Sequence, residues 1–295
     1  MRADPTYING LTQSLNSAAN TANSLSNELS SGLRINTLSD DPTTAATSIR
    51  MGSEIAALDT FAQTASNEGS MLQMTDTTLG EVVTQLTSAV SLAVSASNGT
   101  LNSSNLQAIL QQATGIRDQV LSLANASYQG NYLFSGSQGS TQPFSLDSST
   151  TPATATYSGD SNVQYIMTPG GQKIQMNLPG SSIFTSAFTA LNKFVSDLSS
   201  GASAATISAD SSAITDSLNT VSTQRSLLNG SLSTLNATST YTQTQKAQLT
   251  ASQSTLVAAD TAGIATSLKT NQTQYQAMLS VISSLNSTNL FNYLK

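Results

Sequence analysis

The chain has 295 residues, carries a net charge of −6 at pH 7, and lacks cysteine, histidine and tryptophan. Without cysteine and histidine it can form neither a disulfide framework nor a thiolate site, and it lacks the commonest general base and metal ligand. Only 9% of its residues are charged, where about a quarter is typical, and its scattered Lys and Arg residues form no basic patch for nucleic acid.

Both ends of the chain carry the residue spacing of a coiled coil. Apolar residues recur at alternating intervals of three and four from Ile8 to Leu29, and a matching stripe runs from Val257 to Leu285. We predict two long helices with an assembly seam formed by Ile8, Leu11, Leu15, Leu25, Leu29, Ile264, Leu268, Tyr275, Met278, Ile282 and Leu285. Ordering such a helix costs on the order of 30 to 60 kcal/mol of backbone entropy, so we expect both ends to stay mobile until they pack with other chains.

The stretch SGLRINTLSDDPTTAA follows the first helix. Asp41 has a side chain suited to cap a helix amino terminus, and Pro42 suits the first helical position. We therefore predict that these two residues start the second helix. Asp40 and Asp41 are adjacent and would point apart on a regular element, which makes them a poor catalytic pair.

Three more helices follow from apolar periodicity. Stripes at Leu72–Ala93 and Leu106–Leu123 predict an antiparallel helical hairpin around a turn at Ser97–Asn105. Another long helix is expected from about Ile207, with heptad positions up to Leu256. Arg225 interrupts its seam, and we expect this long side chain to reach solvent rather than a buried partner.

Strands are expected only between Asn131 and about Phe184, where short alternating runs are bounded by Pro-Gly turns. The sequence YQGNYLFSG leads into this segment with three aromatic rings and two glycines. We predict a helix-to-insert hinge here: Gly130 caps a helix that ends near Tyr128, and Gly136 turns the chain. Tyr132 and Phe134 are expected on one side of the first strand. TYSGDSN, around Asp160, is interpreted as a simple turn.

These elements predict a mainly α fold, in which long antiparallel helices form a terminal coiled coil and a helical core with one inserted β-rich domain. We expect three parts. Residues 1–39 with 262–295 form the terminal coiled coil, 40–130 with 186–261 the helical core, and 131–185 the β-rich insert.

No phosphate loop, Ser-His-Asp set or metal-spaced cluster is present in the sequence, so we expect no enzyme and no cofactor. The start shows no cleavable secretion signal, and no apolar stretch reaches the roughly 20 residues of a membrane span. A surface of Ser, Thr, Asn and Gln gives little repulsion between copies, which suits packing against many neighbours but also an extracellular, mucin-like chain.

Several motifs resemble those of the flagellin superfamily. LSSGLRINTLSDDPTTAA at Leu29–Ala46 is similar to its amino-terminal signature, and Asp-Asp-Pro within it resembles the hook-associated junction proteins more than filament flagellins. GNYLFSG at Gly130–Gly136 and the closing NLFNYLK are also similar to that hook-filament junction family, so the resemblance covers essentially the whole chain. Ala259 stands where the family usually has an acidic residue, and MRADPTY inserts a proline at the start.

The resemblance implies a structural adaptor of the bacterial flagellum that joins a hook-associated ring to the flagellin filament and is needed for motility. It also implies type III export without a cleaved signal peptide, an extracellular place in the flagellum, and terminal helices that are disordered in the monomer. The implied partners are other copies in a ring, a neighbouring hook-associated protein, flagellin and a cytosolic export chaperone, with no nucleic acid and no membrane insertion. A filament flagellin and a secreted coiled-coil adhesin are the alternatives.

Overall fold

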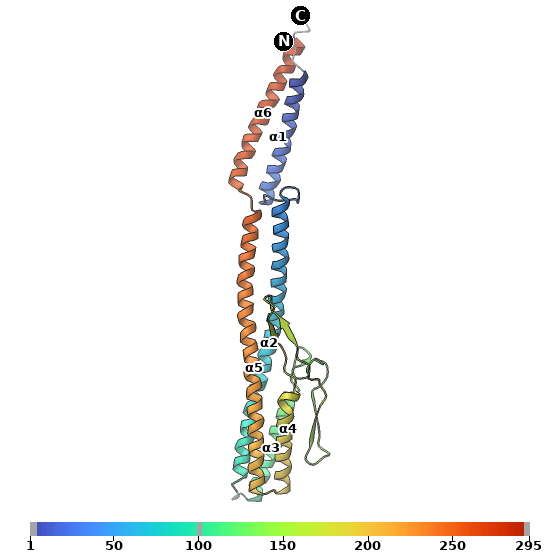
Figure 1. Ribbon diagram of the computed structural model, residues 1–295, viewed down its shortest axis with the longest axis vertical. Helices are drawn as coiled ribbons and strands as arrows, with labels where there is room; N and C mark the ends of the chain where they lie inside the picture. The colour runs from blue at the N-terminus through green and yellow to red at the C-terminus, as the bar shows by residue number, and fades with distance from the viewer. Residues whose placement is uncertain (1–4, 99–101, 292–295) are drawn as a thin grey trace. The chain divides into compact units, whose positions relative to one another are not determined.

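The computed structural model of the chain describes residues 5–98 and 102–291, and the side chains of residues 6–98 and 102–284. Its helices are α1 (Pro5–Ser31), α2 (Pro42–Ala96), α3 (Ser103–Ala124), α4 (Ser181–Ser200), α5 (Ala204–Val257) and α6 (Thr261–Phe291) (Figure 1). The strands that the structure describes all lie between α3 and α4. The predicted fold class, mainly α with a strand-rich insert, is confirmed.

The chain divides into two compact units. The first takes the residues up to Ala57 and from Gln245 onward, and the second takes Leu58–Thr244. Both α2 and α5 contribute residues to each unit. The three-part division expected from the sequence, with boundaries near residues 39, 130, 185 and 261, remains a prediction.

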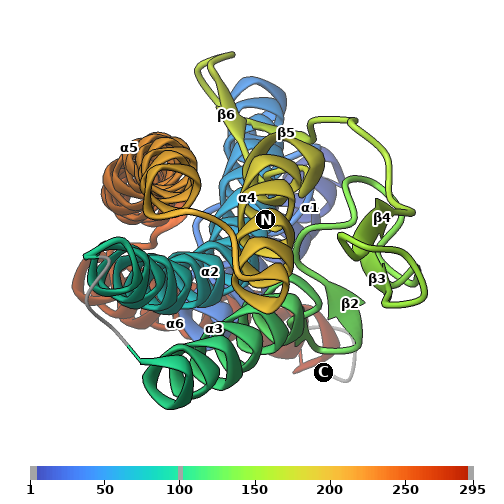
Figure 2. The same cartoon turned by 90° about the horizontal axis from the view of Figure 1, so that it is seen from below.

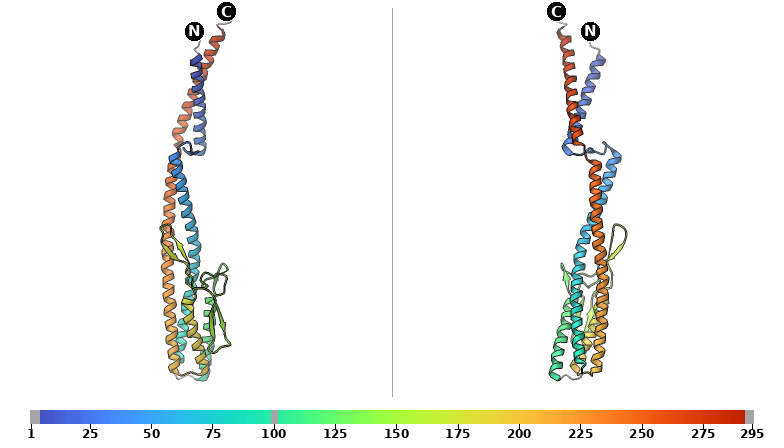
Figure 3. Two further views of the ribbon diagram at one scale, coloured as in Figure 1. Left: turned by 45° about the vertical axis from the view of Figure 1, so that its right-hand side comes forward. Right: turned by 90° about the vertical axis from the view of Figure 1, so that its left-hand side faces the viewer.

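In the first unit, α1 and α6 lie side by side and run antiparallel (Figures 1 and 3). The partner that covers each terminal stripe is therefore the other terminal helix of the same chain. The terminal coiled coil of the expected fold class is thus present, because the two ends have matching spacing and pair with each other. That both ends stay mobile until they pack with other chains remains a prediction.

In the second unit, parts of α2 and α5 join α3 and α4 around one apolar core (Figure 2). Both long helices place a buried residue at every seventh position, which is the heptad repeat of a coiled coil. On α2 these residues are Leu58, Ala65, Leu72, Leu79, Leu86 and Ala93, and on α5 they are Ile207, Ile214, Val221, Leu228, Leu235 and Thr242. The seven-residue repeat in the sequence therefore places these residues on the faces of α2 and α5 that form the core.

Helix α4 begins at Ser181, inside the segment where only strands were expected. Its aromatic residues recur at helical spacing, and Phe184, Phe188 and Phe194 are all buried. The expectation of strands up to Phe184 was wrong at this end, because the run SSIFTSAF has the period of a helix rather than that of a strand.

The expectation that Arg225 reaches solvent was wrong, because its side chain pairs with a carboxylate on α2. Its guanidinium forms two hydrogen bonds to the carboxylate of Asp76 on α2, from Nε to Oδ1 at 2.8 Å and from Nη2 to Oδ2 at 3.1 Å. Gly80 makes room for this contact, since a Cβ there would lie 3.2 Å from Arg225 Nη2. The pair ties α5 to α2 in the middle of the heptad stripe.

The insert consists of three two-stranded antiparallel sheets, each joining consecutive strands. They are β1 (Ser127–Tyr128) with β2 (Asn131–Tyr132), β3 (Phe144–Asp147) with β4 (Thr154–Tyr157), and β5 (Tyr165–Met167) with β6 (Lys173–Gln175). Phe144 on β3 and Ile174 on β6 are buried in the same core as the helices of the second unit. The insert therefore packs on the helices instead of forming a core of its own.

Candidate assembly site

The seam between α1 and α6 is the candidate assembly site. Its side chains are buried or half-buried: Ile8, Leu11, Leu15, Ala18, Ala22 and Leu25 on α1, and Ile264, Leu268, Asn271, Tyr275, Met278 and Ile282 on α6. Of these, only Ala18 and Ile264 are buried, and the others are half-buried. Each helix thus covers the other incompletely, and most of the seam stays accessible from its sides.

Two predicted seam residues differ from the rest. Leu29 is 38% exposed, because it lies in the last turn of α1, where α6 has only just begun. Leu285 falls within α6, but its side chain lies outside those that the structure describes.

The outer surface of the α1–α6 pair is poor in charge and partly apolar. α1 contains one charged residue, Glu28, and α6 contains one, Lys269. Large apolar side chains remain open to solvent on both helices, among them Tyr7 on α1 and Leu279 and Val281 on α6. Such a surface presents little electrostatic barrier to a further helix.

A short backbone connection closes the lower end of the α1–α6 pair. Leu33 and Ala258 form an antiparallel bridge, in which Arg34 N–H donates to Val257 O at 2.8 Å and Ala259 N–H donates to Gly32 O at 3.0 Å. The Arg34 guanidinium also donates to Leu256 O at 3.4 Å. The end of α5 is thereby held against the segment that follows α1.

Asp40 and Asp41 have separate structural tasks. Asp41 Oδ1 accepts from the Thr44 N–H at 3.1 Å at the start of α2, which begins at Pro42. Asp40 accepts from the N–H groups of Asn36 and Thr37, at 2.9 and 2.7 Å. Hydrogen bonds from Thr44 lower the pKa of Asp41 to about 2, and those from Thr37 lower the pKa of Asp40. Both carboxylates therefore hold backbone in place, which suits a structural role.

The predicted hinge is built differently from our expectation. Helix α3 ends at Ala124, and Asn125, not Gly130, occupies its carboxyl-terminal cap. Gly130 lies with Gln129 in the tight turn between β1 and β2, where both have positive φ, at 84° and 50°. The prediction that Gly130 caps the helix was wrong, because SY and NY pair as a hairpin before the insert proper.

Phe134 anchors the insert to the helices. Its ring is fully buried and meets the ring of Phe184 on α4 edge-on, with centroids 4.9 Å apart. Its carbonyl oxygen accepts from Tyr157 Oη at 3.0 Å and from the Gly180 N–H at 2.8 Å. Tyr132, in contrast, is half-buried and is the last residue of β2. Phe134 lies beyond that strand, so the two rings do not share one strand.

Asp160 organises the loop that we interpreted as a simple turn. Its carboxylate accepts from the N–H groups of Ser137 at 2.8 Å and Asn162 at 3.1 Å, and from the Ser137 hydroxyl. These bonds lower the pKa of Asp160 to about 2, with the Ser137 hydroxyl as the main cause. Gly136, with φ 75°, permits the close approach, since a Cβ there would lie 2.1 Å from Asp160 Oδ1. The sequence contains the signal in Gly136 and Asp160, but Ser137 and Asp160 lie 23 residues apart, so their pairing is not visible from local spacing.

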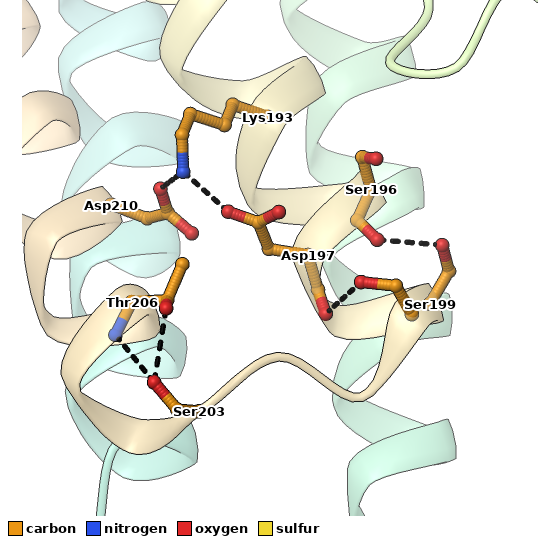
Figure 4. Close-up of polar contacts among 8 residues, drawn as sticks. Lys193, Ser196, Asp197, Ser199, Ser203, Thr206 and Asp210 are labelled. Atoms are coloured by element: carbon orange, nitrogen blue, oxygen red, sulfur yellow. Dashed lines mark hydrogen bonds and ion pairs between the residues drawn. The ribbon is translucent and has the colours of Figure 1, made fainter.

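A charged cluster at the corner between α4 and α5 was not anticipated from the sequence. The Lys193 ammonium lies between two carboxylates (Figure 4), donating to Asp210 Oδ1 at 2.7 Å and to Asp197 Oδ2. The Asp210 side chain is 1% exposed, and its Oδ2 has no hydrogen-bond partner. Burial raises the pKa of Asp210, although the Lys193 ammonium opposes that shift.

Nothing in the described residues has the arrangement of a metal centre. Among residues 5–98 and 102–291, no group of three Asp or Glu side chains is placed to hold a metal ion. By length and composition alone, α2 would be able to cross a membrane. Its buried residues, however, pack within the core of the second unit, which accounts for its apolar character.

Paired terminal helices, a heptad-patterned core and a small strand insert define a class of mainly helical proteins. A family model of the bacterial flagellin N-terminal helical region matches residues 7–139, and one of the C-terminal helical region matches residues 211–294. Together they cover more than half of the chain, which therefore belongs to the bacterial flagellin family.

Curated relatives include both hook-associated proteins and flagellins. The flagellar hook-associated protein 3 of Escherichia coli (strain K12) is 30% identical over 119 residues, which are 40% of this chain and 38% of that protein. Flagellin B of Vibrio cholerae is 32% identical over 127 residues, which are 43% of this chain and 34% of that protein. The chain thus aligns with less than half of the length of these relatives.

Solved structures share the fold. FlgL from Bacillus cereus superposes with a TM-score of 0.60 at 22% identity, covering 70% of this chain and 99% of that chain. FlgL from Xanthomonas campestris gives 0.61 at 16% identity, with 68% and 98% covered. At these identities the likeness concerns the fold.

Proposed function

We propose that the chain is a structural subunit of the bacterial flagellum that joins the hook-associated ring to the flagellin filament. The observation that carries the proposal is the α1–α6 pair, whose seam is half-open and whose two helices hold one charged residue each. A helix pair of this kind gains by burying its open sides against further helices, because most helical stability comes from packing. It acts as an assembly element and needs no catalytic residues.

The junction is favoured over the filament by two sequence features. Asp-Asp-Pro lies at the start of α2, and GNYLFSG supplies the β2 strand of the hairpin and the Phe134 anchor. Both motifs resemble those of the hook-filament junction family. The flagellar hook-associated protein 3 of Escherichia coli is among the relatives, which supports the same choice. A filament flagellin is the second candidate, since Flagellin B is among the relatives.

The proposed role includes its partners and place. Copies of the chain form a ring, in contact with a neighbouring hook-associated protein on one side and flagellin on the other. Before export through the flagellar type III apparatus, without a cleaved signal peptide, a cytosolic chaperone covers the α6 stripe. The assembled protein is extracellular.

A gene deletion tests the role. We expect cells without the gene to retain hooks, to lack attached filaments and to be non-motile, and expression of the chain to restore swimming. Electron microscopy of the cell surface and a soft-agar motility assay give the readout. Flagellated, swimming deletion cells would refute the junction role, and purified chain that polymerises into long filaments would favour the flagellin alternative.

A seam substitution tests the assembly site. Leu25→Asp on α1 and Leu268→Asp on α6 place a carboxylate in the seam, where burial of an unpaired charge is strongly unfavourable. We expect both variants to lose motility while the circular-dichroism melt of the second unit is kept. Asn20→Asp and Gln274→Asp, at exposed positions of the same helices, are the matched controls and should still swim. Loss of the whole melt would contradict the separation of assembly from folding.

A further inference from the structure

A groove between α2 and α5 in the second unit forms a hollow of about 650 Å³. Its walls come from these two helices, and Tyr128 of β1 also lines it. From Ser66 to Thr77 the wall on α2 extends about 17 Å along the helix axis. The groove is therefore long and large enough for a ligand of several rings.

Charged side chains are kept out of this groove. Glu68 and Asp76 lie on the same stretch of α2, but neither belongs to the lining. Asp76 is held by the guanidinium of Arg225 instead. The lining consists of hydroxyl, amide and small or apolar side chains. A ligand that fits this groove is therefore uncharged, because a charged one would lose hydration without gaining a counter-charge.

Three amide side chains line the groove from opposite sides. Gln73 lies on α2, while Asn236 and Gln243 lie on α5. In the part of the chain that the structure describes, no hydrogen bond engages these three amide groups. Each amide offers a carbonyl acceptor and two N–H donors. This combination matches the neighbouring hydroxyl groups of a sugar ring, each of which both donates and accepts.

Tyr128 gives the groove an aromatic ring in a fixed position. It pairs with Asn131 in the β1–β2 hairpin, whose two-residue turn has positive φ at Gln129 and Gly130. The tyrosine is half-buried and packs on the core, so little conformational entropy is lost when a ligand contacts it. The apolar face of such a ring stacks on the C–H face of a sugar, while amides bind the hydroxyl groups at the edge of the sugar.

Gly69 widens the middle of the groove. It lies in the interior of α2, where glycine is less favourable than alanine. The core does not require glycine here, because a Cβ would meet only Leu235 Cδ2, at the ordinary contact distance of 3.8 Å. The missing side chain therefore serves the space of the groove rather than the packing of the helices.

We propose that this groove binds an uncharged oligosaccharide of two or three rings, with one ring stacked on Tyr128 and its hydroxyl groups hydrogen-bonded to the amides of both helices. The proposal goes beyond the junction role and does not rest on it. A third helix is the competing occupant, but an amphipathic helix would place its apolar stripe against walls that are mostly polar.

Calorimetric titration of the full chain tests the class of ligand. The probes are the neutral trisaccharides chitotriose, maltotriose and cellotriose. We expect saturable binding of at least one of them, with a Kd in the millimolar range or below. Sialyllactose, which carries a carboxylate, is the control and should bind about tenfold more weakly than the best neutral probe. If none of the neutral trisaccharides shows saturable binding, the proposal is wrong.

Two substitutions of Tyr128 test the stacking contact. Tyr128→Phe keeps the ring and should bind the trisaccharide as the parent chain does. Tyr128→Leu keeps an apolar side chain without the ring and should weaken binding about tenfold. The circular-dichroism melt of each variant checks that the second unit is folded. Equal binding by the two variants would show that the ring does not stack on the sugar, against the proposal.

Gly69→Leu tests the space of the groove. Leucine favours the helix, so we expect the melting temperature to be unchanged or raised, while trisaccharide binding is lost. Gln73→Leu removes one amide and should weaken binding about threefold to tenfold. Gln248→Leu, at an exposed position of α5 outside the lining, is the matched control and should bind like the parent chain.

Two further results would overturn the proposal. If Gly69→Leu binds the trisaccharide like the parent chain, the sugar lies at another site. If the full chain dimerises in analytical ultracentrifugation and Tyr128→Leu abolishes the dimer, the groove takes a helix of a second copy instead. Neither result bears on the junction role, which the gene deletion tests separately.

Discussion

Lys193 holds a helix corner through two carboxylates at once. Asp210 is buried, and Lys193 supplies the cation for its Oδ1, while half of the lysine side chain stays exposed. Asp197, one turn along α4, contacts the same ammonium. Without the lysine, two carboxylates would share the corner with no counter-charge.

Lys193→Met should therefore destabilise the chain by about 1–3 kcal/mol, the cost of leaving a buried polar group without its partner. The loss should depend on pH with a definite sign. Burial raises the pKa of Asp210 above 3.8 in the folded state, so the folded chain binds a proton at Asp210 more readily than the unfolded chain does. Stability therefore falls as pH rises from the ordinary carboxyl value through the raised pKa of Asp210. Urea unfolding at neutral and acidic pH measures both effects.

Asp210→Asn provides the control for this prediction. The amide keeps the shape of the side chain and carries no charge, so the double variant Lys193→Met with Asp210→Asn should recover most of the lost stability. A double variant as unstable as Lys193→Met alone would show that the lysine acts through Asp197 or through its packing.

Asp160 should make the order of the insert sensitive to acid. Its pKa is lowered from 3.8 to about 2 by the bonds from Ser137 and Asn162. The stabilisation is therefore complete above the unfolded value and is lost as pH falls toward about 2. We expect the amide NMR signals of Ser137 and Asn162 to shift across this window in the parent chain and to lack that transition in Asp160→Asn.

At the scale of elements, the Arg225–Asp76 pair fixes how α5 meets α2. Arg225→Ala leaves the Asp76 side chain, which is 14% exposed, without its bidentate partner. We expect a loss of about 1–3 kcal/mol in the free energy of unfolding. Arg225→Lys keeps the charge but loses the planar two-bond contact, so its loss should be intermediate. If the Arg225→Ala variant has the same free energy of unfolding as the parent chain, water replaces the arginine as the partner of Asp76.

The helices were largely predictable, whereas the contacts between distant elements were not. Heptad spacing marked α1, α2, α5 and α6, because a seven-residue period is a local property of the chain. The sequence does not reveal the partner of Arg225, because Asp76 lies on another helix, 149 residues away. Gly130 was misassigned because a two-residue strand pair leaves almost no periodic signal before the insert.

At the scale of the whole molecule, the two units bury their apolar residues to different degrees. The second unit has many fully buried side chains, among them Leu72, Phe184 and Ile214, while the α1–α6 seam is mostly half-buried. The seam thus gains less hydrophobic stabilisation per residue than the core of the second unit.

Limited proteolysis should reflect this difference. We expect a low-specificity protease to remove roughly the first and last thirty to forty residues of the purified chain, since weakly packed ends open first, and to leave a resistant fragment that contains Leu58–Thr244. Mass spectrometry of the products identifies the cut sites. A protease-resistant full-length chain would contradict the prediction.

The sequence by itself determined the helical periods, the place of the insert and the absence of cysteine and histidine chemistry, because each is written in residue type and local spacing. Only the tertiary structure decided which residues meet: α1 with α6, Arg225 with Asp76, Ser137 with Asp160, and Lys193 with Asp210. The buried Oδ1 of Asn271 belongs to this second group, since a missing hydrogen-bond partner becomes visible only when both helices are in place. Spacing fixes which face of a helix is apolar, whereas packing fixes what that face touches.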